Sequence, residues 1–242
     1  MRTIIWFCWF WIQLIALSPA LRKGKRAQAN GDDATVDAMV QKMVPAWAGG
    51  LMRLAGVTVQ VTGKENIPQD TAVVFVANHR SYYDIPIMLT CLDKPHPLVA
   101  KQELARLPLV RGWMKLLRCV FLDRDNPRKA MQAMNDAMEN LRKGYSVTIF
   151  PEGTRSKGAE TDLLEFKAGA FRMATKTKSP LVPVAIHKSR DIMENNGGWM
   201  KPTQVTMHIL PPIATAELSK EEIKELPQRV QALIQQELQQ MQ

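Results

Sequence analysis

Short runs rich in Val, Ile, Phe and Thr alternate with longer stretches of helical periodicity over most of the chain, from Val57 onward. Runs of β-branched and aromatic residues favour strands, whereas apolar residues that recur every three or four positions favour helices. We therefore expect strands at Val57–Val61, Ala72–Ala77, Leu98–Ala100, Cys119–Leu122, Val147–Phe150, Leu181–Ile186 and Val205–Ile209.

The stretch between the fourth and fifth of these strands carries the signals of one well-bounded helix. Asn126 can cap its first turn, Pro127 suits its first position and Gly144 can end it. We expect its apolar stripe to face the core rather than a metal or cofactor; the stripe consists of Met131, Met134, Met138 and Leu141. A strand, a helix and a strand in this order predict a βαβ crossover. The predicted fold class is therefore α/β, with a mixed, largely parallel sheet flanked by helices.

The last part of the chain predicts a further helix that packs on this sheet. Ser219 and Glu222 have the spacing of a capping box, and Leu218 can contact Ile223 as a hydrophobic staple. Pro227 disturbs an otherwise regular apolar stripe, whose members are Ile223, Leu226, Val230, Leu233 and Leu238. We assign this helix no chemistry.

The first part of the chain is almost wholly apolar from Thr3 to Leu21 and carries no charge there. A helix of this length roughly matches the ~30 Å hydrocarbon core of a bilayer. A basic cluster at residues 22–26 follows, and such a cluster marks the cytoplasmic side and favours anionic headgroups. A transmembrane helix and a helix that lies in the interface both fit, the latter because tryptophans prefer the headgroup zone. A signal peptide fits poorly because the basic residues lie on the wrong flank, although residues 18–20 have the small-x-small shape of a cleavage site.

A second helix is expected from Ala34 to Leu54, after a polar turn at residues 30–33. Pro45 should kink it. The helix could pack on the main core or face a membrane beside the first one, and the sequence leaves both open. We divide the chain into membrane-anchoring helices at residues 1–56 and a main domain at residues 57–242.

The charge balance favours an anionic partner. Lys and Arg number 32 against 23 Asp and Glu, a net charge of +9, which would suit nucleic acid, a membrane surface or a phosphorylated substrate. The sequence lacks the aromatic-interleaved basic stretch typical of nucleic-acid binding. Its 3 cysteines lack metal-ligand spacing, which favours a reducing compartment and predicts small buried hydrophobes. No metal site is expected.

The loop after the second expected strand reads Asn-His-Arg-Ser-Tyr-Tyr-Asp, from Asn78 to Asp84. A histidine can take a proton from a hydroxyl, and a nearby carboxylate can hold its tautomer. His79 and Asp84 would need a turn between them, because positions five apart do not share a helix face. Asp84 could instead be an ordinary N-cap before Ile85 and Pro86.

A second loop follows the strand Val147–Phe150 and reads Pro-Glu-Gly-Thr-Arg-Ser. Gly153 lets a ligand approach the backbone closely. Glu152 can accept hydrogen bonds from glycerol hydroxyls, and Arg155 offers a guanidinium fork that matches phosphate. An ordinary charged turn would look similar.

Together the two loops resemble the glycerophosphate acyltransferase family, particularly its 1-acylglycerol-3-phosphate acyltransferases. The resemblance rests on Asn-His-x4-Asp, the HX4D motif, followed about 70 residues later by Phe-Pro-Glu-Gly-Thr-Arg-Ser. Two weaker blocks, at residues 120–124 and 181–186, are similar to the family's second and fourth motifs, and Lys101 matches a family lysine. The blocks occur in family order over residues 78–186.

The resemblance implies a role for each matching residue. His79 would be the general base, oriented by Asp84, and Lys101 or a backbone amide would stabilise the oxyanion. Arg80 stands where many relatives carry other residues, so the resemblance leaves its role open. The residues implied in binding glycerol phosphate are Arg124, Glu152, Gly153, Thr154 and Arg155.

The resemblance further implies transfer of a fatty acyl group from an acyl thioester to the free hydroxyl of 1-acylglycerol 3-phosphate, which gives phosphatidic acid. The donor would be acyl-CoA or acyl-acyl-carrier protein, with no other cofactor. A membrane lipid as acceptor implies a place at the cell membrane, with the main domain, here the acyltransferase domain, on the cytoplasmic side. Acylation of another acceptor, such as glycerol 3-phosphate or another lysolipid, stays open. A non-catalytic lipid-binding protein is a further alternative, although it would have no need of a base.

Overall fold

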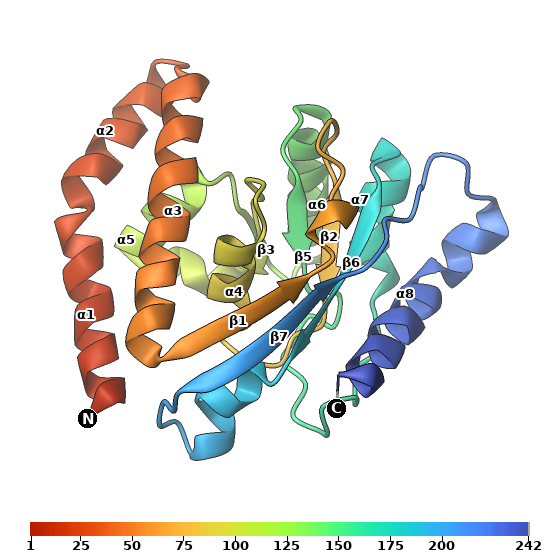
Figure 1. Ribbon diagram of the computed structural model, residues 1–242. Coiled ribbons are helices and arrows are strands. Elements are labelled where there is room, and N and C mark those ends of the chain that lie inside the picture. Colours follow the sequence, from red (N-terminus) through yellow and green to blue (C-terminus); the bar gives the residue numbers. More distant parts are fainter. Residues whose placement is uncertain (242) are drawn as a thin grey trace.

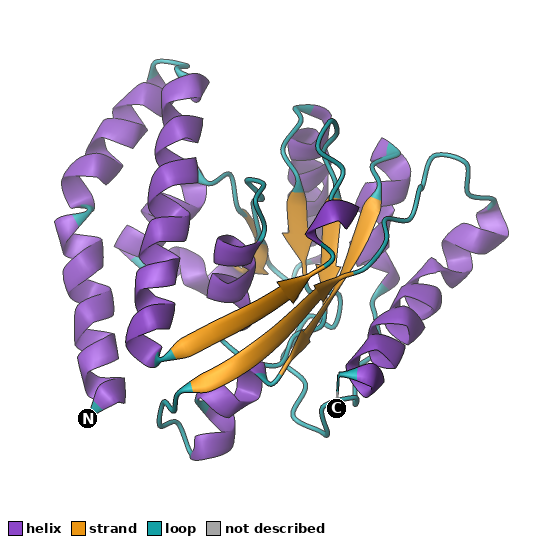
Figure 2. Ribbon diagram, viewed as in Figure 1, coloured by secondary structure: helices purple, strands orange, loops and turns teal. Residues whose placement is uncertain are grey.

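The predicted strands form a sheet with helices on both faces (Figures 1 and 2). The computed structural model describes residues 1–241. The strands are β1 (Val57–Thr62), β2 (Val74–Ala77), β3 (Val99–Lys101), β4 (Val120–Leu122), β5 (Val147–Ile149), β6 (Leu181–His187) and β7 (Thr203–Ile209).

The sheet is mixed and largely parallel, as predicted. Five strands run in the order β1-β7-β6-β2-β5, and β3 pairs with β4 beside them. A bridge between Leu98 and Thr148 joins this pair to β5. The β1–β7, β2–β5, β2–β6 and β3–β4 ladders are parallel, and the β6–β7 ladder is antiparallel.

Alternate residues of the central strand β2 supply two separate hydrophobic cores, because successive side chains of a strand point to opposite faces. Val74 and Val76 pack under α6 (Pro127–Arg142), α7 (Ala168–Thr177) and α8 (Lys220–Gln240). Phe75 and Ala77 pack under α3 (Asp33–Ala55) and α4 (Asp84–Cys91). The second expected helix of the chain therefore packs on the core.

The prediction of a single helix from Thr3 to Leu21 is wrong. The chain forms α1 (Arg2–Ala16) and α2 (Ser18–Ala29), bent by 47°. Pro19 lies in the first turn of α2, where its missing N–H does no harm, and inside one long helix it would have removed a hydrogen bond and clashed with a carbonyl. Among the described residues no helix alone has the length and apolarity for a bilayer span, although α1 and α2 together do.

The helices α1 and α2 lie against α3 and are built into the protein (Figure 1). Leu14 of α1 and Leu21 of α2 share a buried cluster with Val36 of α3 and Leu116 of α5 (Pro108–Leu116). Gly56 ends α3 in the left-handed conformation, with φ 79°, and β1 begins at the next residue. The predicted boundary at residues 56 and 57 falls at this turn, but apolar contacts join the two sides.

The predicted caps of α6 and α8 are confirmed, and two side chains differ from the prediction. The Ser219 capping box forms at the start of α8, and Asn126 caps α6. Met131 of α6 and Ile223 of α8 were expected in the core, but both are exposed, and each lies in the first two turns of its helix. Figure 1 shows that the first turns of α8 extend beyond the sheet. Short 3₁₀ segments complete the structure, at Lys64–Asn66, Gln102–Arg106, Ser189–Ile192 and Glu194–Asn196.

Replacement of Gly56 by alanine should destabilise the protein more than the same change at Gly31. Both glycines have positive φ, so each alanine costs roughly 1–2 kcal/mol for the left-handed conformation. At Gly56 the new Cβ would also lie 2.8 Å from Nη1 of Arg2 and 3.3 Å from Cα of Pro202, whereas Gly31 has open space. Urea unfolding of both variants measures the difference, and equal losses would contradict this packing of α1.

Candidate functional site

The loops after β5, β2 and β6 meet at one edge of the sheet. These three strands are neighbours and run parallel, so their carboxyl ends lie together. In open α/β sheets such an edge is where ligands bind. Asn78 fastens the central loop there, because its side chain donates to Ile186 O (2.9 Å) and accepts from Ile186 N–H (2.8 Å).

His79 and Asp84 are brought into contact, as predicted. The Nδ1 atom of His79 lies 2.9 Å from Oδ2 of Asp84. The same oxygen accepts the backbone N–H groups of Arg80 (2.7 Å) and Ser81 (2.8 Å). The turn that the pair required is therefore closed by the carboxylate itself.

Asp84 orients the histidine and does not serve as an N-cap. It is the first residue of α4, and Tyr83 occupies the N-cap position. Among the residues that the structure describes, no side chain caps that helix. The Asp84 side chain is fully buried. The positive end of the helix dipole favours a carboxylate at this position.

The His79 ring is also packed against an aromatic side chain. It stacks on Phe150, with 4.2 Å between ring centroids, and its side chain is 17% exposed. With Nδ1–H donating to Asp84, Nε2 carries the lone pair. Among residues 1–241 no protein group hydrogen-bonds Nε2. The ring is thus fixed, with its basic nitrogen free for a substrate.

Glu152 joins the two motif loops. Its carboxylate is buried and accepts the backbone N–H groups of His79 (2.7 Å) and Leu164 (2.9 Å). Burial raises the pKa of the Glu152 carboxyl, and the two N–H groups oppose that rise. Its predicted contact with glycerol hydroxyls stays a prediction, because both oxygens already have backbone partners.

Two cationic side chains flank Gly153. A Cβ atom at this glycine would lie 3.3 Å from Nζ of Lys167 and 3.5 Å from Cζ of Arg124. Gly153 has φ 73°, a conformation that other residues rarely adopt. Both side chains belong to exposed residues, and neither is paired with a carboxylate in the part of the chain that the structure describes. Lys167 is also the N-cap residue of α7, so the free N–H groups of that helix begin beside it.

Lys167 was missed in the sequence. A lysine directly before a predicted helix, where Ser, Thr, Asp or Asn is usual, was the available signal.

Arg155 points elsewhere, although it was predicted to bind the same phosphate. Its guanidinium stacks on Tyr82 at 3.5 Å from the ring centroid, and Nη1 lies 3.3 Å from Oε1 of Glu194. Glu194 also accepts from Ser81 Oγ (2.8 Å) and Tyr82 N–H (2.9 Å). Glu194 is a second residue that the motifs did not reveal.

Two further residues that were predicted to belong to the site, Thr154 and Lys101, form no hydrogen bond or ion pair with His79 or Asp84 among the described residues. Thr154 is exposed at the tip of its loop. Lys101 is the last residue of β3, its side chain is 60% exposed, and its Nζ pairs with Glu103 at 2.7 Å. No hydrogen bond joins Lys101 to the His79 loop among the described residues, so its predicted role stays a prediction.

The other titratable candidates lie outside this arrangement. Burial lowers the pKa of His96 to about 4 and raises that of Cys119 to about 12. Cys91 is also buried, but Cys8 is exposed, so the expectation that all three cysteines are buried is wrong for Cys8, which lies on the outer side of α1. Within residues 1–241 no three His, Cys, Asp or Glu side chains gather as a metal site.

The chain is similar in sequence to known acyltransferases. The sequence model of the family described as "Acyltransferase" matches residues 58–187. A 1-acyl-sn-glycerol-3-phosphate acyltransferase from Borreliella burgdorferi is 34% identical over 173 residues, which cover 72% of this chain and 68% of the relative. The enzyme of that name from Saccharomyces cerevisiae is 33% identical over 178 residues, or 73% of this chain and 58% of the relative.

A solved structure extends the similarity to the whole fold. The crystal structure of the 1-acyl-sn-glycerophosphate (LPA) acyltransferase PlsC from Thermotoga maritima has a TM-score of 0.77 and 26% identity, and the match covers 100% of this chain and 98% of that one. The resemblance carried by the two motif loops is confirmed, and the chain belongs to the acyltransferase family.

Proposed function

We propose that the chain is an O-acyltransferase that moves a fatty acyl group from an acyl thioester to the free hydroxyl of 1-acylglycerol 3-phosphate, giving phosphatidic acid. The observation that carries the proposal is the His79–Asp84 pair, in which Nδ1 contacts the carboxylate and no group of residues 1–241 hydrogen-bonds Nε2. The relatives named for this reaction support the choice of acceptor. Glycerol 3-phosphate and other lysolipids are the alternatives that an acceptor panel tests.

The proposed reaction is a direct transfer. Nε2 of His79 removes the proton of the acceptor hydroxyl, and the oxygen attacks the thioester carbonyl. The resulting tetrahedral oxyanion collapses and the carbon–sulfur bond breaks. The departing thiolate takes the proton from the imidazolium and leaves as a thiol, which returns His79 to its neutral form. Asp84 stabilises that imidazolium throughout. The scheme uses no metal or further cofactor, and the donor can be acyl-CoA or acyl-acyl-carrier protein. Lys101 or a backbone amide is proposed to stabilise the oxyanion.

The acceptor phosphate is proposed to bind beside Gly153, between Arg124 and Lys167. Arg124 and Lys167, which have no carboxylate partner within residues 1–241, flank this glycine, which has no side chain. The N-terminus of α7 adds N–H donors and the positive end of its dipole. Glu152 joins this loop to the backbone of His79, so the phosphate site and the base are held in one framework.

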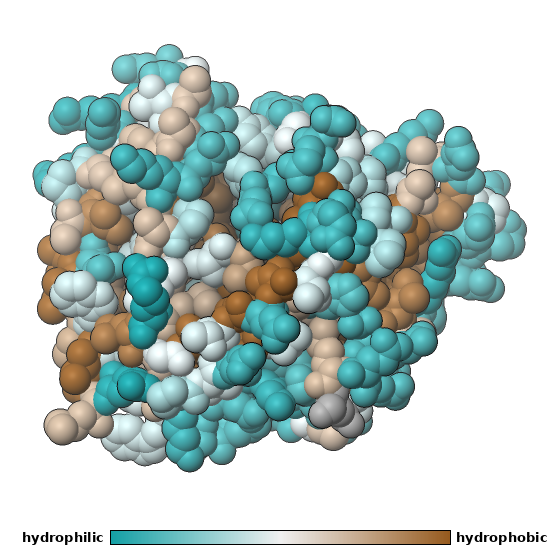
Figure 3. Space-filling view, viewed as in Figure 1, coloured by the Kyte–Doolittle hydropathy of each residue, from teal (hydrophilic) through white to brown (hydrophobic). Residues whose placement is uncertain are grey.

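The chain is proposed to work at the cell membrane, with the acyltransferase domain on the cytoplasmic side. The inner face of α1 packs on the protein, whereas its outer face exposes a row of large apolar side chains (Figure 3), namely Ile4, Ile5, Phe7, Trp9, Trp11, Ile12 and Ile15. Four exposed basic residues of α2 follow, at positions 22, 23, 25 and 26. An apolar face beside a basic cluster suits an anionic lipid surface.

Replacement of His79 by alanine should lower kcat by about a thousandfold or more, because the general base and its orientation are lost together. Purified protein, lysophosphatidic acid and each acyl thioester in turn provide the assay. His208 is the matched control, because it also contacts a carboxylate, Glu237, but lies on β7 and packs toward α8. His208→Ala should keep kcat. Turnover by His79→Ala close to that of the unchanged protein would rule out this base.

Replacement of Arg124 or Lys167 by alanine should raise the KM for the phosphate-bearing acceptor. A lost charge-assisted hydrogen bond is worth about 1.5–3 kcal/mol, or roughly ten- to hundredfold in KM. The KM for the thioester donor should change little. Arg155→Ala serves as the comparison, because Arg155 already pairs with Glu194 and Tyr82. A larger rise for Arg155→Ala would place the phosphate on that side of the loop.

An acidic substitution on the outer face of α1 should weaken membrane binding. Ile15 is 61% exposed, and its replacement by glutamate places a charge where the apolar row would enter the lipid. Met131, 59% exposed on α6, is the matched control. Cosedimentation with phosphatidylglycerol vesicles should fall for Ile15→Glu and stay unchanged for Met131→Glu. Equal binding by the two variants would show that α1 is not the contact.

A further inference from the structure

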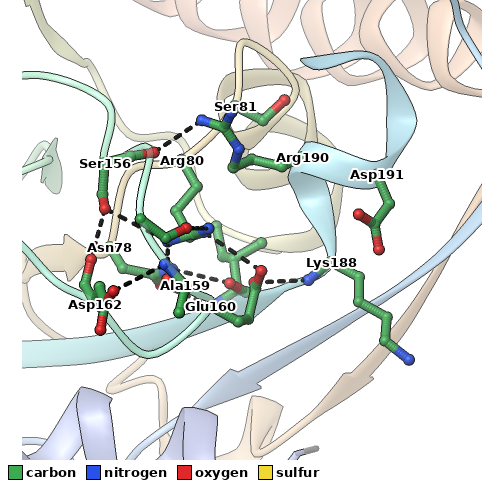
Figure 4. Close-up of polar contacts among 12 residues, drawn as sticks. Asn78, Arg80, Ser81, Ser156, Ala159, Glu160, Asp162, Lys188, Arg190 and Asp191 are labelled. Carbon is green, nitrogen blue, oxygen red and sulfur yellow. Dashed lines mark hydrogen bonds and ion pairs between the residues drawn. The ribbon is translucent and has the colours of Figure 1, made fainter. Parts of the chain in front are cut away.

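Arg80 is a buried arginine in the middle of the HX4D loop that the proposed reaction leaves unused. It directly follows His79, and only 2% of its side chain is exposed. Figure 4 shows that the side chain reaches toward the segment of residues 156–162, which continues the Glu152–Arg155 loop. The guanidinium therefore lies between the two motif loops.

The guanidinium makes contacts along this whole segment. Nη1 donates to Ala159 O (2.6 Å) and Ser156 Oγ (3.4 Å), and Nη2 donates to Gly158 O (2.9 Å). Nε lies 3.4 Å from Oε2 of Glu160. A planar guanidinium can donate to two adjacent carbonyls and a hydroxyl while its charge faces a carboxylate, which here is an ion pair without a hydrogen bond.

The backbone of Arg80 belongs to the catalytic pair. Its N–H donates to Oδ2 of Asp84 at 2.7 Å, the oxygen that also holds Nδ1 of His79. Arg80 thus binds Asp84 through its backbone N–H and binds the segment of residues 156–162 through its side chain. A second hydrogen bond joins the same two loops, because Ser156 N–H donates to His79 O at 2.8 Å.

Stability alone does not account for this arrangement. Burial of a guanidinium carries a large desolvation penalty, which the ion pair and hydrogen bonds offset rather than exceed by much. The hydrogen bonds do fix a geometry, because they set where residues 156–162 lie relative to the histidine. A displacement of about 1 Å between reacting groups can cost a hundredfold in rate.

We propose that Arg80 is a positioning residue, which sets the distance between the His79 base and the loop that binds the acceptor. The inference rests on the proposed acyl transfer. It assigns Arg80 no contact with substrate. Its loss should therefore act on kcat more than on the acceptor KM.

Steady-state kinetics of Arg80→Lys and Arg80→Ala test the inference. Lysine keeps a cation opposite Glu160 but cannot bond both carbonyls, so kcat should fall about tenfold with the acceptor KM changed by less than about threefold. Alanine should lower kcat by about a hundredfold. Guanidinium chloride, well below denaturing concentration, should restore part of the kcat of Arg80→Ala, and sodium chloride at the same concentration should not.

Arg190 is the matched control. Its Nη1 donates to Ser156 O at 3.0 Å and its Nε to Asn195 Oδ1 at 3.0 Å, so it fastens the same segment (Figure 4). Among the described residues it forms no hydrogen bond or ion pair with the HX4D loop. Arg190→Ala should keep kcat within about threefold, and guanidinium should have no effect on it.

The outcomes separate this inference from the proposed function. No turnover by the unchanged protein with any acceptor would overturn the proposed function itself. Turnover by the unchanged protein, with kcat retained in both Arg80 variants, would overturn only the positioning role. An equal loss in Arg190→Ala would also overturn it, since any fastening of the segment would then suffice. If Arg80→Ala does not fold, Arg80→Lys alone tests the positioning role, and an unchanged kcat of that variant would overturn it.

Discussion

The arrangement of the site depends on one carboxylate oxygen. Oδ2 of Asp84 receives the imidazole of His79 and the backbone N–H groups of Arg80 and Ser81, so a single buried atom closes the loop and orients the ring. The start of α4 supplies a favourable field for that charge. The side chain that is proposed to orient the base is thereby also the one that closes its own loop.

The sheet order explains why the two motif loops meet although they are far apart in the sequence. β2 lies between β5 and β6, and the three strands are parallel, so loops that start from residues 78, 150 and 188 leave from one edge. Side chains then join loop to loop: Asn78 binds β6, and Glu152 binds the backbone of His79. The buried polar groups of this edge are thus shared between loops, and His79, the Gly153 turn and the Arg155–Glu194 pair form one connected unit.

The strands, the fold class and the HX4D contact could be predicted from the sequence, because each depends on local pattern or on residues five apart. What the sequence did not predict depends on distant contacts. The break at Ser18 and Pro19 was readable in principle, but the continuous apolar run outweighed it. Lys167, Glu194 and the side chain of Arg80 belong to no motif, and only the fold brings them to the site. Arg155 shows the reverse case, since a motif residue is already paired with a partner that lies 39 positions away.

The difference in exposure among the three cysteines allows one of them to be labelled selectively. Cys91 and Cys119 are buried and burial raises the pKa of both thiols, whereas Cys8 is exposed on α1. Thiolates, not thiols, react with maleimides and similar reagents. A fluorophore or spin label added to the native chain would therefore attach at one position, in the outward row of apolar side chains. Without any engineered mutation, its emission or its relaxation would report how deeply that helix sits in a bilayer.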